Sequence, residues 1–328
     1  MKGDPPVLLR TPSRRVLLGG LGLLALVGAG VAGIRYAAFM DEARRRLSGR
    51  SAVIASSFGA LEYAMAGEGP PLLMIHGTGG GFDQGLLFAG RLVGRGYRVI
   101  APSRFGYLRS DFPDDPSPAN QADAFVALLD HLGIEKLPVA GGSAGSLSAA
   151  AFALRHPDRC SGLILLVPAM NVMGRDPVVM TPLEKRVVET VLISDFLLWS
   201  AMQIAPRRLI GTLLATDPAL LGEVSPAERQ RAFAVLEALM PIGAKARGVV
   251  NDAKLVASPA GMDFSRIAVP TLVLSLEDDR YGTADTARAI AAAMPMARLV
   301  IYPRGGHIYL GHDEDVAGEI VGFAAGLG

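Results

Sequence analysis

Short apolar runs of strand length recur along the chain from residue 71 onward, separated by stretches rich in alanine and leucine. A strand that reads as a continuous apolar run is buried on both faces, as happens when helices cover both sides of a mostly parallel sheet. The pattern therefore predicts an α/β fold. The runs are PLLMIHG (71–77), YRVIAPS (97–103), KLPVAGG (136–142), GLILLVPA (162–169), TLVLSLED (271–278) and ARLVIYP (297–303).

Two segments in front of these runs alternate more regularly between apolar and polar residues, SAVIASSFG (51–59) and ALEYAMAG (60–67). Alternation is typical of strands with one solvated face, so we expect an antiparallel pair at the edge of the sheet. Together the segments predict a mostly parallel sheet of eight strands with helices on both faces.

The strand pattern stops between Pro168 and about Phe264, where helix-like apolar segments replace it. About 95 residues are far too many for one connection in a compact sheet. We therefore expect a helical cap inserted at about residues 169–264. Pockets of open α/β sheets lie beyond the carboxyl ends of the strands, where such a cap is placed to act as a lid.

An uncharged run of 19 residues, Val16–Ile34, lies between arginines near the start of the chain. This length can cross a bilayer as one helix and exceeds the apolar region of a signal peptide. We expect an anchor in the lipid bilayer, with a charged linker completing residues 1–50 and the α/β body in residues 51–328. Arg14 and Arg15 resemble a twin-arginine export signal, which would place the body outside the cytoplasm; a cleaved signal and a buried helix remain alternatives.

The formal net charge of +1 is unevenly distributed. Residues 1–50 hold 9 of the 32 Lys and Arg and 3 of the 31 Asp and Glu, which leaves 23 basic and 28 acidic side chains, a net charge of −5, on residues 51–328. A body of that sign gives no electrostatic footprint for nucleic acid, so we expect no such partner. The single Cys160 excludes an internal disulfide and leaves the redox compartment undecided.

One serine stands among small residues in GGSAG (141–145). The stretch follows a strand-length run and precedes a helix-like one, SLSAAAFALRHP (146–157), which is the strand-turn-helix setting of a nucleophile elbow. Small residues let strand and helix approach closely while the serine hydroxyl stands exposed at the end of the sheet. We predict that Ser143 is a nucleophile.

A serine hydroxyl needs a neighbouring base to take its proton. His307 follows a strand-length run and two glycines, which places it on a loop at the carboxyl end of a strand, and we predict that it is this base. His312, at the start of the last helix, is the alternative. His131 and His156 lie late in helices, where a surface role is typical.

The imidazole in turn needs an acidic partner that fixes its tautomer. Glu277, Asp278 and Asp279 stand at the end of the strand-length run TLVLSLED and just beyond it. They are the candidates for this partner, and a solvated acidic turn is the alternative interpretation.

With this chain order of serine, acid and histidine, the body resembles the serine hydrolases of the α/β-hydrolase superfamily, over essentially residues 52–328. The resemblance implies that Asp279 is the acid of the triad. In this sequence Leu276 replaces the glycine of the family's Gly-x-x-Asp motif, and Asp278 therefore stays an alternative.

The motif LLMIHGTGGG (72–81) resembles the His-Gly-x loop of the same family. The resemblance implies that the backbone N–H groups of Thr78 and Ala144 form an oxyanion hole, and that His76 orients the loop. The glycines are followed by no phosphate-binding lysine, and no histidines have metal-ligand spacing, so we expect neither a cofactor nor a metal.

The expected reaction is hydrolysis of a carboxylic ester through an acyl-enzyme, with an apolar or lipid-like small-molecule substrate because the cap is rich in apolar residues. The HGTGGG loop (76–81) also resembles that of carbon–carbon bond hydrolases acting on ring-cleavage products, and cofactor-free perhydrolases share the triad. A non-catalytic ligand-binding protein of this fold is a further alternative.

Overall fold

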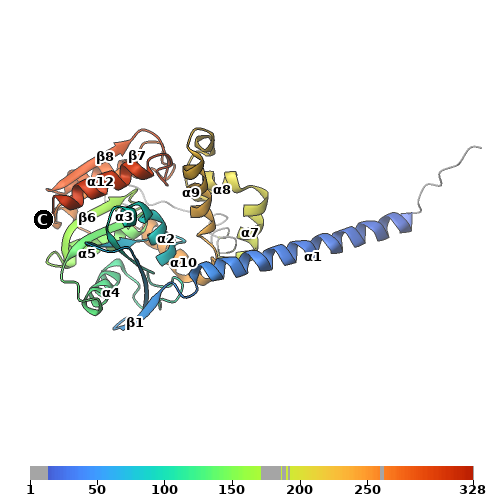
Figure 1. The fold of residues 1–328 in the computed structure, drawn as a ribbon, viewed down its shortest axis with the longest axis horizontal. Coiled ribbons are helices and arrows are strands. Elements are labelled where there is room, and N and C mark those ends of the chain that lie inside the picture. Colours follow the sequence, from blue (N-terminus) through green and yellow to red (C-terminus); the bar gives the residue numbers. More distant parts are fainter. Residues whose placement is uncertain (1–13, 171–185, 187–189, 191–192, 259–261, 328) are drawn as a thin grey trace, which may run out of the picture.

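Eight strands form one sheet in the spatial order β1-β2-β4-β3-β5-β6-β7-β8 (Figure 1). The structure, a computed structural model, describes residues 14–170, 186, 190, 193–258 and 262–327, with side chains from residue 28 onward. The strands are β1 (Ala52–Ser56), β2 (Gly59–Ala66), β3 (Pro71–Ile75), β4 (Arg98–Pro102), β5 (Leu137–Gly142), β6 (Cys160–Leu166), β7 (Thr271–Leu276) and β8 (Ala297–Tyr302).

Strand β2 pairs antiparallel with β1 and β4, and the other neighbouring strands of the described sheet pair in parallel. The predicted sheet is confirmed. One detail differs from the expectation. The apolar run of β8 predicts a strand as buried as β7, but Arg298 and Leu299 of β8 are exposed. β8 is an edge strand with one neighbour, so its outer part is left uncovered.

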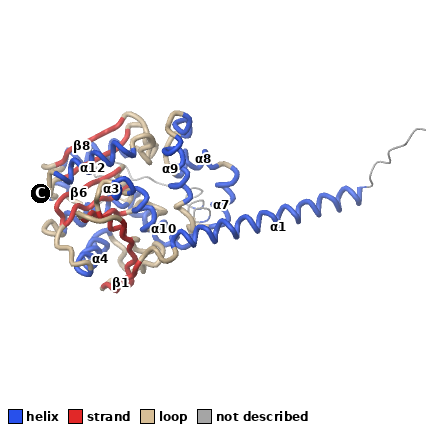
Figure 2. Tube along the Cα trace, viewed as in Figure 1, coloured by secondary structure: helices blue, strands red, loops and turns tan. Residues whose placement is uncertain are grey.

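Helices cover both faces of the sheet (Figure 2). Along β6, Leu163 and Leu165 belong to the core on one face, while Ile164 and Leu166 belong to the core on the other. This alternation explains why the strands are apolar throughout. The first face carries α4 (Pro118–His131), α5 (Gly145–Arg155) and α11 (Thr283–Ala293), and the second carries α2 (Phe82–Phe88), α3 (Gly90–Gly94) and α12 (Asp313–Ala325).

A helical layer lies between β6 and β7, where the cap was expected. Part of that range, residues 171–185, 187–189, 191–192 and 259–261, lies outside the described residues. The described helices are α7 (Asp195–Ile204), α8 (Pro206–Leu213), α9 (Pro226–Glu237) and α10 (Ala246–Ala257), with short 3₁₀ turns η1 (Pro218–Gly222), η2 (Gly243–Lys245) and η3 (Phe264–Arg266).

The first helix, α1 (Arg14–Leu47), projects from the body (Figure 1). Its last turns pack on the cap, where Met40 and Ala43 are buried in one apolar cluster with Trp199 and Met202. The predicted anchor begins at residue 16, and the structure describes side chains only from residue 28 onward, so most of the anchor has no described side chains. Within the described part of the chain, no helix has the length and apolarity to cross a membrane, and the anchor stays a prediction.

Candidate active site

Ser143 occupies a strained turn between β5 and α5. Its φ is 53°, in the left-handed region of backbone conformation that residues other than glycine rarely adopt. The surrounding backbone holds this conformation, because the Ser143 N–H donates to the Leu166 carbonyl (2.9 Å) and its own carbonyl accepts from the Ser146 N–H (3.0 Å). The turn therefore points the serine side chain out of the sheet, as the sequence predicts for a nucleophile elbow.

Gly141 and Gly145 make this turn possible, because without a Cβ atom the backbone segments on either side of Ser143 can approach closely. A Cβ atom on Gly145 would lie 2.4 Å from the His76 carbonyl oxygen, and one on Gly141 would lie 2.6 Å from the Gly145 carbonyl oxygen. Both distances are far below any van der Waals contact. The start of α5 therefore lies directly against β5 and against the loop after β3.

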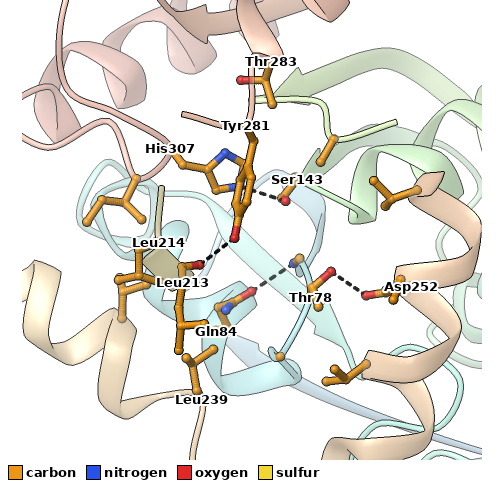
Figure 3. A pocket seen from close by; sticks show the side chains of 18 of the residues that line it. Thr78, Gln84, Ser143, Leu213, Leu214, Leu239, Asp252, Tyr281, Thr283 and His307 are labelled. Atoms are coloured by element: carbon orange, nitrogen blue, oxygen red, sulfur yellow. Dashed lines mark hydrogen bonds between the residues drawn. The ribbon is translucent and has the colours of Figure 1, made fainter. Parts of the chain in front are cut away.

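The structure brings the three predicted residues into one hydrogen-bonded chain, of which Figure 3 shows the contact between Ser143 and His307. Ser143 Oγ lies 2.8 Å from His307 Nε2, and His307 Nδ1 lies 2.8 Å from Asp279 Oδ2. An ionised carboxylate only accepts hydrogen bonds, so the proton of the neutral ring is assigned to Nδ1, which leaves Nε2 to accept from the serine hydroxyl. The three residues follow the carboxyl ends of β5, β7 and β8, and these ends point the same way because the strands run parallel.

Several donors converge on the Asp279 carboxylate. Burial raises the pKa of this group, but the histidine ring, the Thr283 hydroxyl and the Tyr281 N–H, which donates to Oδ1 at 2.9 Å, together lower the pKa of Asp279 below its ordinary value. The carboxylate therefore stays ionised at neutral pH and can stabilise a protonated His307.

The alternative residues have other partners. Asp278 accepts from the N–H groups of Gly305 (3.1 Å) and Gly306 (2.8 Å), so it shapes the loop that carries the histidine. His312 lies 2.8 Å from Asp315 and stacks on the Tyr302 ring. Neither alternative is bonded to the serine or to His307.

The two expected oxyanion donors flank the serine. Ala144 follows it directly, and the loop that carries Thr78 comes so close that a Cβ on Gly77 would lie 3.0 Å from the Ser143 Cβ. In the described part of the chain, no hydrogen bond uses the backbone N–H of Thr78 or Ala144. Both donors are therefore available to an oxygen bound beside the serine.

His76 is buried behind this loop and belongs to its scaffold. Its Nδ1 lies 2.7 Å from the Gly77 carbonyl and its Nε2 accepts from the Arg104 N–H (2.9 Å). Burial first, and then the charge of Arg104, lower the pKa of His76 well below its ordinary value. The ring is therefore neutral at pH 7, which fits the orienting role expected from the sequence.

A cavity of about 620 Å³ opens onto the serine and histidine. Its walls are mostly apolar, and none of the described residues that line it is Lys or Arg. No group of His, Cys, Asp and Glu among the described side chains is placed to hold a metal ion. The apolar lining includes Phe88, Met170, Leu198, Leu213, Leu214, Val235, Leu239, Ile242, Val249, Val256 and Ile308.

Tyr281 and Asp252 are two polar residues of the lining that the sequence analysis did not single out. The Tyr281 hydroxyl donates to the Leu213 carbonyl (3.0 Å), and its ring meets the His307 ring edge to face, 4.9 Å between centroids. Asp252, on α10, accepts from the Thr78 hydroxyl (2.9 Å). A signal for Asp252 did exist, because it lies three residues after Val249 and four before Val256, on the apolar face of its helix.

The chain belongs to the α/β-hydrolase family. A family model described as the alpha/beta hydrolase fold matches residues 70–311. Among solved structures, an alpha/beta hydrolase fold protein from Nakamurella multipartita superposes with a TM-score of 0.68 at 26% identity, covering 85% of this chain and 100% of that chain.

Curated relatives are enzymes of the same family. The 2-hydroxy-6-oxo-6-phenylhexa-2,4-dienoate hydrolase of Burkholderia cepacia is 31% identical over 247 residues, 74% of this chain and 82% of that protein. The 2-hydroxy-6-oxononadienedioate/2-hydroxy-6-oxononatrienedioate hydrolase of Comamonas testosteroni is 30% identical over 251 residues, with the same coverage. The protein is a hydrolase.

The packing of the turn predicts a stability effect. Gly145→Ala will lower the free energy of unfolding by about 1–3 kcal/mol or more, because the new methyl group meets backbone that cannot move aside. Gly322→Ala, in α12 with no atom within 4 Å of the added Cβ, is the matched control and should stabilise by up to about 1 kcal/mol. Urea denaturation measures the free energy of unfolding of both variants. A Gly145→Ala protein that unfolds at the same urea concentration as Gly322→Ala would contradict the packing argument.

Proposed function

We propose that Ser143, His307 and Asp279 form a catalytic triad and that Thr78 and Ala144 supply the oxyanion hole. The observation that carries this proposal is the chain of two 2.8 Å contacts from serine through histidine to aspartate. His307 takes the hydroxyl proton as Ser143 attacks a carbonyl carbon, and the two backbone N–H groups stabilise the resulting oxyanion. A water molecule, activated by His307, then releases the acyl group.

We propose cleavage of a carbon–carbon bond beside a ketone as the reaction. The support is the likeness to the two dienoate hydrolases, which extends over three quarters of this chain. The ketone carbon is attacked by Ser143, the oxyanion collapses, and the bond to the neighbouring carbon breaks. For a 2-hydroxydienoate this step follows tautomerisation of the enol to the 2-keto form, so that the leaving carbon is saturated. That carbon then leaves with the electron pair, which is delocalised into the conjugated 2-carbonyl group, and it takes its proton from His307.

Ester hydrolysis is the second candidate, and the charge of the pocket favours it. The dienoates named for the relatives carry a carboxylate, and a buried carboxylate needs a cationic or hydrogen-bonding partner. The described lining offers no Lys or Arg, and its one carboxylate, Asp252, already holds the guanidinium of Arg104. An uncharged, apolar ester fits this lining directly, and its alkoxide leaving group would take the same proton from His307.

Two substrates assayed side by side separate these reactions. The purified chain is given a ring-cleavage dienoate, followed by loss of its absorbance, and a chain-length series of nitrophenyl esters. Turnover of the dienoate with a higher kcat/KM supports carbon–carbon cleavage, whereas turnover of esters alone assigns the second candidate. Ser143→Ala should lower either activity at least about 10⁴-fold, and full activity in that variant would refute the serine mechanism.

Substitution of the adjacent aspartates separates their roles. Asp279→Asn should lower kcat by about 10⁴-fold, because the histidine loses the partner that fixes its tautomer. Asp278→Asn is the matched control: it keeps the shape of the side chain, and its amide oxygen can still accept from one of the two N–H groups, which Asp278 binds through separate oxygens. The variant loses one hydrogen bond that does not touch the histidine ring, so kcat should fall by about 10-fold or less. Steady-state kinetics with the preferred substrate measures both, and the reverse ranking would make Asp278 the acid.

We also propose that residues 16–34 anchor the enzyme in a bilayer. Support comes from an exposed apolar face where α1 meets α7: Ile34 is 73% exposed, Ile204 83% and Phe196 50%. The two helices lie side by side there, since Tyr36 meets Phe196 edge to face with ring centroids 5.4 Å apart. Exposed apolar side chains gathered on two adjoining helices are typical of contact with a membrane or a partner.

Fractionation of the expressing cells tests the anchor. The full chain should sediment with membranes and resist extraction by 1 M salt, because insertion of an apolar helix is not electrostatic. A chain shortened to residues 51–328 should stay in the supernatant. A full chain that is found in the supernatant would contradict the proposal.

A further inference from the structure

A carboxylate of the cap lies against the loop that carries the expected oxyanion donor. Asp252 is on the cap helix α10, and the loop follows β3 in the sheet domain, 174 positions away from Asp252 at Thr78. Figure 3 shows the two side chains joined by a hydrogen bond, and the Asp252 Oδ2 to Thr78 Oγ1 distance is 2.9 Å.

Arg104 holds this carboxylate in place from the core side. Its two terminal nitrogens donate to both oxygens of Asp252, Nη1 to Oδ1 at 2.7 Å and Nη2 to Oδ2 at 2.6 Å. Both side chains are buried, 6% and 2% exposed. Burial lowers the pKa of Arg104, but the charge of Asp252 and the interactions with Tyr107 together raise this pKa above its ordinary value, so the guanidinium stays charged. Bidentate pairing fixes orientation as well as distance.

Tyr107 extends the contact to the next residue of the loop. Its hydroxyl donates to Asp252 Oδ2 (2.6 Å) and accepts from the Gly79 N–H (3.3 Å). Burial and the charge of Asp252 raise the pKa of Tyr107 well above its ordinary value, so the hydroxyl keeps its proton and donates it to the carboxylate. One carboxylate therefore holds two consecutive loop residues, Thr78 directly and Gly79 through a tyrosine.

The core holds the preceding two residues of the loop by itself. His76 accepts from the Arg104 N–H (2.9 Å), and the Gly77 N–H donates to Gln84 Oε1 (3.0 Å). Each residue of the stretch 76–79 thus has its own partner, and only the second half depends on the cap.

The glycines around Thr78 make such support necessary. Gly77, Gly79 and Gly80 have wide conformational freedom, so the loop alone would sample many directions of the Thr78 N–H. An oxyanion donor stabilises the transition state only when it is already aimed at the developing charge.

We infer that Asp252 is a positioning residue: through the Thr78 hydroxyl it aims the Thr78 backbone N–H at the oxyanion, and so couples docking of α10 to catalysis. This inference rests on the proposed function of the site. It assigns the cap a part in the chemical step in addition to its part in covering the pocket.

Removal of the Thr78 hydroxyl tests the inference without breaking the Arg104–Asp252 ion pair. Thr78→Val keeps the shape of the side chain and deletes one contact, and Thr78→Ser restores the hydroxyl. The readouts are kcat, KM and the affinity for a trifluoromethyl ketone, which forms a tetrahedral oxyanion on the serine. Circular dichroism and the thermal midpoint confirm that each variant is folded.

We expect Thr78→Val to lower kcat about 10- to 100-fold with KM changed less than about 3-fold, because the lost contact serves the transition state. Affinity for the ketone should fall by the same factor, and Thr78→Ser should recover most of both losses.

Two other results overturn the inference. A Thr78→Val enzyme with the wild-type kcat and ketone affinity shows that the hydroxyl contact is structural only, while the proposed function stands. A wild-type chain that turns over neither substrate class and does not react with a serine-directed phosphonate refutes the proposed function, and this inference with it.

Discussion

The backbone contact between the start of α5 and the loop after β3 is the constraint on which the site depends. At Gly145 no side chain fits, because a Cβ would lie 2.4 Å from the His76 carbonyl oxygen. This approach places Ser143 beside the His-Gly loop and lets its strained φ of 53° persist, since the surrounding hydrogen bonds over-determine the turn. Ser143 and the His-Gly loop are adjacent for this packing reason.

Three carboxylates fix the other parts of the site, and each accepts hydrogen bonds from a different group. Asp279 accepts from the histidine that touches the serine, while its neighbour Asp278 accepts from two N–H groups of the loop that carries this histidine. Asp252 acts from the cap and is matched by the guanidinium of Arg104. Burial of Asp279 and Asp252 costs desolvation, which the converging donors at Asp279 and the bidentate Arg104 at Asp252 offset.

The pocket combines this polar edge with an apolar interior contributed largely by the cap. Carbonyl chemistry is favoured where water is excluded, because electrostatic interactions strengthen in a low dielectric. The described lining offers no Lys or Arg to a carboxylate. The polar side chains at the strand ends and most of the apolar lining thus come from different parts of the chain.

The eight-stranded sheet, the strand-turn-helix setting of Ser143 and the chain order of serine, acid and histidine could be predicted from the sequence. Each depends on a local pattern: apolar runs, small residues around a serine, or polar residues directly after a strand. The choice between Asp278 and Asp279 as the partner of His307 was decided by the tertiary structure, since both follow the same strand and only the fold says which side chain meets the histidine. The contact of Asp252 with Thr78 also came from the tertiary structure alone. Residues 174 positions apart share no local pattern, and their distance is set by how the cap packs on the core.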